Sequence, residues 1–278
     1  MIEMKLELVE IETDTHPLDG LLYYPEGKPS RGAVMIFHGN TMNFYTGASR
    51  FLPPMLCELG YACLSFNRRG HDILSIRDSR IAVGAALQTT AEGIADNLYA
   101  AQWMSNKGFK NPILIGHSNG GFLAVQHAAA NPDTAGLILL SAHGGGTIAE
   151  KLAARTGLLG ASKTDELRER ATQMIAEGKG DDLMILPGWW YVATANSYID
   201  RLTTMPNTVE TAPGISCPSL FIRGDMEIPE AYPAEDFAAA TAGICDVEII
   251  DDCDHFYRNK EAVVTRIVRS WILKTLMV

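Results

Sequence analysis

The stretch Ile113-Leu-Ile-Gly-His-Ser-Asn-Gly-Gly-Phe122 places a serine between two glycines, after a short apolar run and before an Ala-rich segment. The apolar run predicts a buried strand, and the Ala-rich segment predicts a helix. A serine at such a tight turn is held in a strained conformation, and the flanking glycines let neighbouring backbone approach. Its hydroxyl would lie at the carboxyl edge of the sheet, near a helix N-terminus that favours negative charge. Ser118 is therefore the candidate nucleophile; the alternative is a purely structural glycine–serine turn.

Similar apolar runs occur on both sides of this motif. The opening pair alternates apolar and polar residues, which is typical of half-buried antiparallel strands. The later runs are continuous, as expected of strands covered on both faces, and helical patterns separate them. The expected strands are 4–12, 18–24, 33–37, 61–66, 112–115, 136–140, 218–222 and 247–250, and the expected helices are 89–106, 121–130, 233–242 and 260–276. This alternation predicts an α/β fold with a mostly parallel central sheet and helices on both faces.

Residues 143–213 interrupt the alternation, because they contain helical pieces and turns but no buried-strand run. Two helical stretches are expected there, at 164–177 and about 193–202. The interval is too long for an ordinary loop. We therefore expect a core formed by residues 1–142 and 214–278 and a helical cap formed by residues 143–213. The alternative is an insertion that serves only oligomerisation.

Composition excludes several classes of protein. The chain has 278 residues, of which 47% are hydrophobic and 20% are charged, so a disordered or collagen-like chain is excluded. With 23 Lys and Arg against 33 Asp and Glu, the net charge of −10 argues against nucleic acid or an anionic membrane as the main partner. Neither a membrane-spanning run nor a signal peptide is visible, which predicts a cytoplasmic protein.

The five cysteines are odd in number, scattered and without Cys-x-x-Cys spacing. This pattern supports neither a disulfide framework nor a zinc site. We interpret most of them as small core residues.

A serine hydroxyl needs a base within hydrogen-bond reach. Among seven histidines, His255 follows the last expected strand in Asp251-Asp-Cys-Asp-His-Phe256, at the same sheet edge as the serine. An acid that orients the imidazole should come from that edge too, and Asp225 follows the strand at 218–222. The predicted order along the chain is Ser118, Asp225, His255. Glu227 is the rival acid, and Asp246 is less favoured because it opens a strand at the opposite end.

These features resemble the α/β-hydrolase fold, and the likeness covers nearly the whole chain. It is carried by His38-Gly39-Asn40, by Gly116-His-Ser-Asn-Gly120, and by Gly224-Asp225 together with Asp254-His255. The turn Asn67-Arg-Arg-Gly-His71 is similar to another turn of this family. The departures are asparagines at positions 40, 67 and 119.

The resemblance and the physical argument assign the same roles. Ser118 attacks an acyl carbon, His255 takes and returns the proton, and Asp225 orients the imidazole. The backbone N–H groups of Asn119 and Asn40 are expected to form the oxyanion hole, with Thr41 as the second donor if the loop register differs. No cofactor and no metal is required. Asp251, Asp252 and Asp254 are interpreted as solvated loop residues rather than metal ligands.

Aromatic residues supply the candidate substrate pocket. Phe44 and Tyr45 follow the expected oxyanion loop, and Trp189, Trp190 and Tyr191 lie in the expected cap. For each of these aromatic groups, an equally acceptable interpretation is that the side chains only pack against their neighbours and do not contact a substrate.

The sequence therefore predicts a serine hydrolase acting on a carboxylic ester, thioester or related acyl bond of a small molecule. Hydrolysis of a carbon–carbon bond in a diketone, opening of a lactone or amide, and acyl transfer would use the same three residues. A small-molecule receptor built on the same fold is the non-enzymatic alternative. The oligomeric state is left open.

Overall fold

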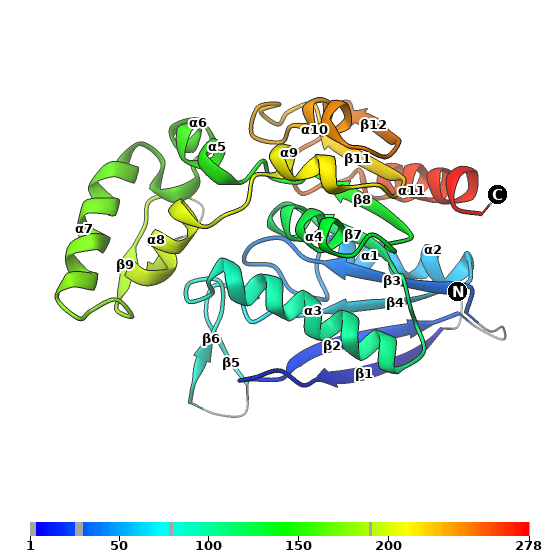
Figure 1. The fold of residues 1–278 in the computed structure, drawn as a ribbon, viewed down its shortest axis with the longest axis horizontal. Coiled ribbons are helices and arrows are strands. Elements are labelled where there is room, and N and C mark those ends of the chain that lie inside the picture. Colours follow the sequence, from blue (N-terminus) through cyan, green and yellow to red (C-terminus); the bar gives the residue numbers. More distant parts are fainter. Residues whose placement is uncertain (1–3, 26–29, 78–79, 189–190, 278) are drawn as a thin grey trace.

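The computed structural model describes residues 4–25, 30–77, 80–188 and 191–277. At its centre is an eight-stranded sheet in the order β1-β2-β4-β3-β7-β8-β11-β12 (Figure 1). The strands are β1 (Lys5–Ile11), β2 (Leu18–Tyr24), β3 (Gly32–Phe37), β4 (Tyr61–Phe66), β7 (Ile113–His117), β8 (Gly136–Leu140), β11 (Ser219–Gly224) and β12 (Cys245–Ile250). β2 pairs antiparallel with β1 and β4, and the remaining neighbours are parallel. The predicted α/β fold with a mostly parallel sheet is confirmed.

Burial along the strands follows their positions in the sheet. Every residue of β4, β7, β8 and β11 is buried, as expected of strands covered on both faces. The expectation of a covered strand is wrong for β12, because it forms the edge of the sheet and most of its side chains are half-buried or exposed.

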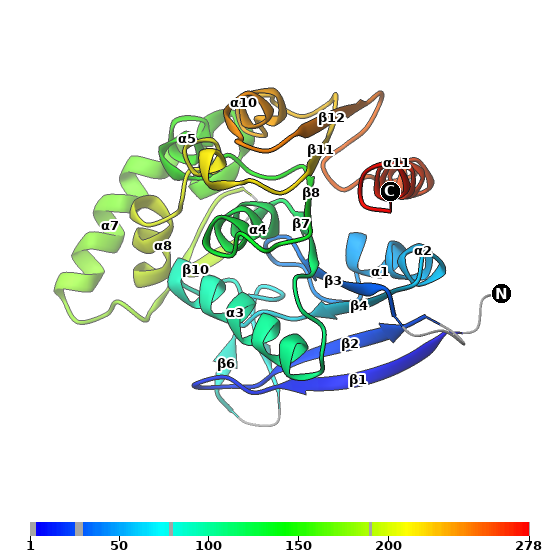
Figure 2. The same cartoon turned by 45° about the vertical axis from the view of Figure 1, so that its right-hand side comes forward.

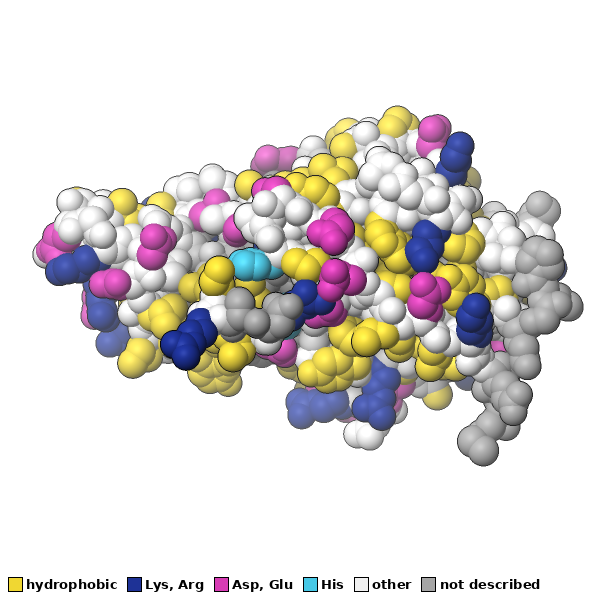
Figure 3. Space-filling view, turned by 90° about the horizontal axis from the view of Figure 1, so that it is seen from below, with side chains coloured by type: hydrophobic (Ala, Val, Ile, Leu, Met, Phe, Trp, Pro, Cys, Tyr) yellow, Lys and Arg dark blue, Asp and Glu magenta, His cyan; other side chains and the backbone are white. Residues whose placement is uncertain are grey.

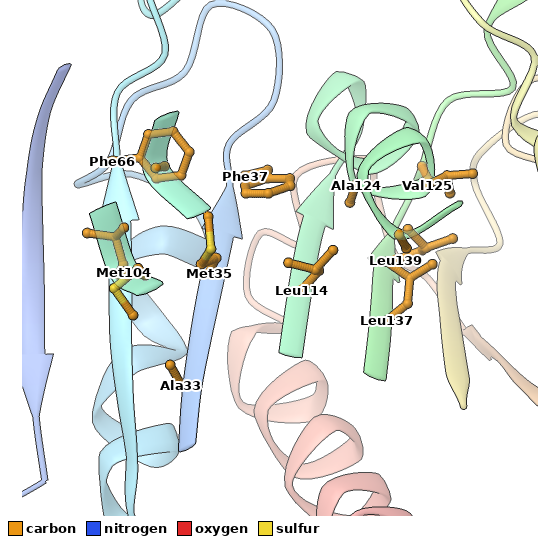
Figure 4. Packing of buried hydrophobic residues seen from close by; sticks show 14 of the residues in the cluster. Ala33, Met35, Phe37, Phe66, Met104, Leu114, Ala124, Val125, Leu137 and Leu139 are labelled. Atoms are coloured by element: carbon orange, nitrogen blue, oxygen red, sulfur yellow. The ribbon is translucent and has the colours of Figure 1, made fainter. Parts of the chain in front are cut away.

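Helices cover both faces of the sheet (Figure 2). Buried side chains of α3 (Thr90–Asn106), α4 (Asn119–Ala130) and α10 (Ala234–Ala240) pack in one cluster with Met35 and Phe37 of β3. Figure 4 shows Ala124 and Val125 of α4 beside the strand residues of this cluster. α1 (Ala48–Phe51), α2 (Pro53–Glu58) and α11 (Glu261–Thr275) pack on the opposite face.

Between β8 and β11 the chain forms further elements, most of which lie at one end of the molecule, while the last two pack beside α4 and α10 (Figure 1). They are α5 (Gly146–Lys151), α6 (Ala153–Thr156), η1 (Leu158–Lys163), α7 (Thr164–Ala176), β9 (Leu183–Ile185), β10 (Val192–Thr194), α8 (Ala195–Thr203), α9 (Thr208–Thr211) and η2 (Ala212–Gly214). β9 and β10 pair as a small antiparallel sheet, which the sequence patterns did not predict. A second short pair, β5 (Ser75–Ile76) and β6 (Ala82–Val83), was also not predicted.

This group of elements packs on the core through α4. Phe122 and Leu123 of α4 share a buried cluster with Leu159, Leu167 and Tyr198. Since α4 begins directly after Ser118, the contact places the group beside the candidate nucleophile.

The surface carries charged side chains of both signs. On the face shown in Figure 3, acidic and basic side chains are interspersed, and the described residues form no continuous basic surface there. Among the described residues, no helix is both long enough and apolar enough to cross a membrane.

Candidate active site

Ser118 occupies a left-handed backbone conformation, with φ 53° and ψ −118°, between β7 and α4. This conformation is strained for a residue with a side chain and is found at functional turns. The flanking glycines allow it: a Cβ on Gly116 would lie 2.4 Å from the carbonyl oxygen of Gly120, and one on Gly120 would lie 2.1 Å from that of Phe37. The predicted strand-to-helix turn is present, and its glycines are required by close backbone approach.

The candidate base lies against the candidate nucleophile. His255, in the loop between β12 and α11, places its Nε2 3.0 Å from Oγ of Ser118. The two residues are 137 positions apart in the sequence and meet at the carboxyl edge of the sheet. The structure therefore brings together the serine and the histidine that the sequence singled out.

The acid hydrogen-bonded to His255 is Glu227, not Asp225. Nδ1 of His255 lies 2.7 Å from Oε1 of Glu227, whose side chain is only 3% exposed. Asp225 is exposed and accepts a hydrogen bond from the backbone N–H of Cys253, which lowers the pKa of the Asp225 carboxyl. The chain turns after β11, since the N–H of Glu227 donates to the carbonyl of Gly224. The turn directs Asp225 outward, so the prediction for Asp225 is wrong and the rival Glu227 takes its place.

Glu227 is held by further hydrogen bonds. Its Oε2 accepts from the backbone N–H of Gly224 at 2.9 Å and from the hydroxyl of Ser141 at 2.5 Å. The Ser141 oxygen lies 2.6 Å from the hydroxyl of Tyr257, which also donates to the carbonyl of Ile222. Burial holds the pKa of Tyr257 well above its usual value, so this phenol stays protonated.

Sequence reasoning missed Ser141 and Tyr257. Ser141 directly follows β8, and Tyr257 lies two residues after His255. Position at the carboxyl edge of the sheet was the signal that could have found them.

His117, next to the nucleophile, supports the loop that carries the base. Its Nε2–H donates to the backbone carbonyl of His255 at 2.9 Å, and the two rings lie 4.9 Å apart between centroids. Burial, together with the nearby imidazole of His255, lowers the pKa of His117 to about 4. His117 is therefore neutral at pH 7 and adds no charge beside the base.

Asn40 and Asn119 both border the cavity above Ser118. Asn119 is the first residue of α4, so its N–H has no partner within the helix. The side-chain oxygen of Asn119 accepts from Nη2 of Arg68 at 3.3 Å, and that of Asn40 accepts from Nη1 of Arg201 at 3.4 Å. The structure thus brings both expected oxyanion residues beside the serine. Thr41 borders the same cavity.

In the cavity above Ser118, the centres of water molecules can reach a volume of about 60 Å³. Such a volume holds roughly four water molecules. Its apolar lining comes from both the core and the chain between β8 and β11: Met42, Phe122, Ala149, Leu158, Met205, Tyr232 and Phe256.

Phe44, Tyr45 and Tyr191, three of the aromatic residues expected to form the pocket, do not border this cavity. Phe44 and Tyr45 pack edge to face at 5.2 Å between centroids, and the Tyr45 side chain is 55% exposed. The N–H of Phe44 donates to the side-chain oxygen of Asn67 at 2.9 Å. Tyr191 is 60% exposed and also lies outside the lining. The prediction is wrong for these three residues, and Trp189 and Trp190 lie outside the described residues.

Asp254, in the acidic loop before His255, forms hydrogen bonds with residues close to it in the chain. Asp254 accepts from the backbone N–H of Phe256 and from Nε of Arg258. No group of three or more His, Cys, Asp or Glu side chains among the described residues is arranged to hold a metal ion.

The chain also matches the model of a known protein family. Residues 34–265 match the model of the family described as the alpha/beta hydrolase family. The chain belongs to that family. The matched range includes the serine, glutamate and histidine that meet at the sheet edge. Among curated proteins, no significant sequence match was found.

Solved structures with this fold are similar over almost the whole chain. Est1E from Butyrivibrio proteoclasticus, with ferulic acid bound, is 22% identical, with a TM-score of 0.75, 97% of this chain covered and 100% of that chain covered. A carboxyl esterase from Bacillus coagulans is 15% identical, with a TM-score of 0.67 and coverage of 99% and 100%. A dienelactone hydrolase from Anabaena variabilis is 16% identical, with a TM-score of 0.62 and coverage of 98% and 99%. At these identities the likeness shows the fold.

Proposed function

We propose that this alpha/beta hydrolase is a serine hydrolase that cleaves a carboxylic ester of a small molecule through an acyl-enzyme. The observation that carries the proposal is the continuous chain of hydrogen-bonding atoms from Ser118 through His255 to Glu227, with separations of 3.0 and 2.7 Å. A serine, a base and an orienting acid in contact are what activation of a hydroxyl nucleophile requires.

Each proton has a donor and an acceptor in this arrangement. With Nδ1–H of His255 donating to Glu227, Nε2 is the nitrogen that accepts the proton of the Ser118 hydroxyl. The serine oxygen then bonds to the acyl carbon, and the imidazolium returns the proton to the departing alcohol. Water attacks the acyl-enzyme by the same route and releases the acid and the serine. Glu227 stabilises the imidazolium through its hydrogen bond to Nδ1–H.

The tetrahedral intermediate carries its negative charge on the former carbonyl oxygen. We assign its stabilisation to the backbone N–H groups of Asn119 and Asn40, which both border the cavity beside Ser118. The N-terminus of α4 adds a favourable dipole at the same place. Loss of one such donor costs on the order of 10²–10³ in turnover.

The size and lining of the cavity fit a small acyl group. Its volume of about 60 Å³ and its largely apolar lining favour a short, uncharged acyl chain. Part of the lining comes from residues 143–213, which we propose act as a cap over the nucleophile. Thioester, lactone, amide or diketone cleavage and acyl transfer use the same residues, and the similar structures named as esterases and a dienelactone hydrolase support ester chemistry first.

A panel of p-nitrophenyl esters and acyl thioesters of increasing acyl length tests this function. We expect turnover of the short esters, lost by at least about 10³-fold in Ser118→Ala and in His255→Ala. Ser105→Ala, near the end of α3, is the control and should retain wild-type rates. A fluorophosphonate probe should label the wild-type protein stoichiometrically and leave the Ser118→Ala protein unlabelled.

The same experiment tests the non-enzymatic alternative. A receptor would bind small acyl compounds without labelling and without turnover that depends on Ser118. That result would contradict the proposed hydrolase.

A further inference from the structure

Arg68 is a fully buried arginine that contacts both sides of the candidate oxyanion hole. It follows β4 by two residues and is 1% exposed. Its Nη2 donates to the backbone carbonyl of His38 at 2.6 Å and to the side-chain oxygen of Asn119 at 3.3 Å. Its own backbone N–H donates to Nε2 of His38 at 3.2 Å.

The two contacted residues belong to the two segments that carry the proposed oxyanion donors. His38 begins the loop His38-Gly39-Asn40, and Asn119 directly follows the nucleophile. These segments are far apart in the sequence and come from the ends of β3 and β7, which are neighbouring strands. A single guanidinium group therefore fixes the spacing between them.

The charge of Arg68 is only partly compensated. Asp96, the carboxylate that acts on Arg68 through space, accepts hydrogen bonds from the backbone N–H and Nε of Arg69, each at 2.7 Å, and from the side-chain amide of Gln88 at 3.1 Å. Among the described residues, no hydrogen-bond partner is found for Nε or Nη1 of Arg68. Burial lowers the pKa of Arg68 to about 10, so the group is still positive at pH 7.

A buried charge with unused donors is costly, and stability alone does not explain it. An apolar side chain of similar volume would fill the same space without that cost. Placed beside an oxyanion hole, a positive charge in a water-excluded site stabilises negative charge that develops in the transition state. The feature is therefore explained by the reaction rather than by the fold.

We propose that Arg68 is a positioning residue for the oxyanion hole. It sets the distance between the two donor segments and adds positive potential at the tetrahedral intermediate. This inference rests on the proposed serine hydrolase function. Because the oxyanion exists only after attack, Arg68 acts on the rate of the chemical step and not on binding of the ester.

The test compares Arg68→Met, Arg68→Lys and Arg223→Met with the wild-type protein on the p-nitrophenyl ester that it hydrolyses best. Arg223 is a matched control because it is also buried, at 5% exposed, and pairs through Nη2 with Glu235. We expect kcat of Arg68→Met to fall by about 10- to 100-fold, below the loss for removing a donor outright, with KM within about twofold. Arg68→Lys keeps the positive charge but loses the planar guanidinium, so its kcat should lie between that of the wild-type protein and that of Arg68→Met.

Binding of a trifluoromethyl ketone analogue of the acyl group provides a second readout. Its adduct with Ser118 mimics the tetrahedral intermediate, so its affinity should fall by the same factor as kcat/KM. The unreactive methyl ketone should bind all variants equally. Thermal unfolding checks that each variant is folded, and if Arg68→Met does not fold, a several-fold lower kcat of Arg68→Lys at unchanged KM carries the test.

An unchanged kcat in Arg68→Met, a loss confined to KM, or an equal loss in Arg223→Met would overturn this inference while the proposed function stood. A wild-type protein without turnover dependent on Ser118 would instead contradict the proposed function, and this inference with it.

Discussion

The carboxylate of Glu227 accepts three hydrogen bonds, and each donor comes from a different part of the chain. His255, Gly224 and Ser141 lie after β12, at the end of β11 and after β8. Three donors on one buried carboxylate stabilise its charged form and fix its orientation. The position of this single side chain therefore sets the tautomer and the direction of the His255 imidazole.

Replacement of Glu227 by Gln should lower kcat by on the order of 10³–10⁴, because the amide can no longer hold the imidazole in the productive tautomer. Asp225→Asn is the matched control, since Asp225 is exposed and accepts a hydrogen bond from the backbone N–H of Cys253 rather than from His255. We expect its kcat to stay within about twofold of wild type. Steady-state kinetics on a p-nitrophenyl ester measures both variants, and an equal loss in both would contradict the assignment of Glu227.

At this scale the sequence predicted two of the three residues whose side chains meet at the sheet edge. Ser118 and His255 could be predicted because a turn motif and a strand end fix their positions. The acid could not be decided, because Asp225 and Glu227 lie in the same loop and only the turn after β11 determines which one faces inward. The prediction that Phe44 and Tyr45 line the pocket was wrong for a similar reason, since the composition of a loop does not determine which of its side chains border the cavity at Ser118.

The turn between β7 and α4 depends on contacts between elements. Gly120 lies against the carbonyl oxygens of Phe37 and His38 at the end of β3, and Gly121 lies against Ala142, just after β8. The first turn of α4 is therefore packed directly on the backbone of its neighbours. No side chain fits there without moving a strand.

Gly120→Ala should lower the free energy of unfolding by at least about 3 kcal/mol, because its Cβ would meet backbone that cannot move cheaply. Gly32→Ala, at the start of β3, is the control: the nearest atom to its added Cβ is a Tyr61 ring carbon at 3.6 Å. Its free energy of unfolding should change by less than about 1 kcal/mol. Urea denaturation measures both, and equal stability of the two variants would show that the turn tolerates a side chain.

Elements with a strong periodic pattern could be predicted from sequence, and short ones could not. The eight strands of the main sheet match continuous or alternating apolar runs. β9 and β10 have three residues each, and β5 and β6 have two, which is too short for a period to be visible. Their pairing depends on tertiary contacts that only the folded chain provides.

Across the described residues, buried histidines make stability sensitive to acid, and His38 is one of them because burial holds its pKa well below the usual value. Burial lowers the pKa values of His117, His127 and His143 to about 4, in the first and third cases with a contribution from nearby His255. In the unfolded chain these groups titrate near 6.5, so below that pH the unfolded state binds more protons than the folded state. Stability is therefore retained above pH 6.5 and lost as the pH falls toward 4.

By pH 5 each of these histidines should lower the free energy of unfolding by about 2 kcal/mol relative to pH 7.5. Asp96 offsets part of this loss, because burial raises its pKa to about 6 and the folded state takes up a proton there. Urea unfolding at pH 7.5, 6 and 5 measures the dependence, and His127→Gln should make it shallower. Equal or greater stability at pH 5 would contradict the prediction.

The overall architecture could be predicted from the order of patterns, because alternating strands and helices leave few arrangements. The insertion between β8 and β11 was also visible as an interval without buried strands. The packing of this insertion on the core could not be predicted. It depends on the contact of Leu159 and Tyr198 with Phe122 and Leu123, residues that no local sequence pattern connects.

The separation of 137 residues between nucleophile and base has a consequence for biosynthesis. The ribosome makes the chain from its N-terminus, and domains begin to fold as they emerge. A nascent chain that has reached α10 contains Ser118 and Glu227 but not His255, so its serine has no partner to take up a proton. The hydrogen-bonded chain from Ser118 through His255 to Glu227 can therefore form only after the loop between β12 and α11 has been synthesised.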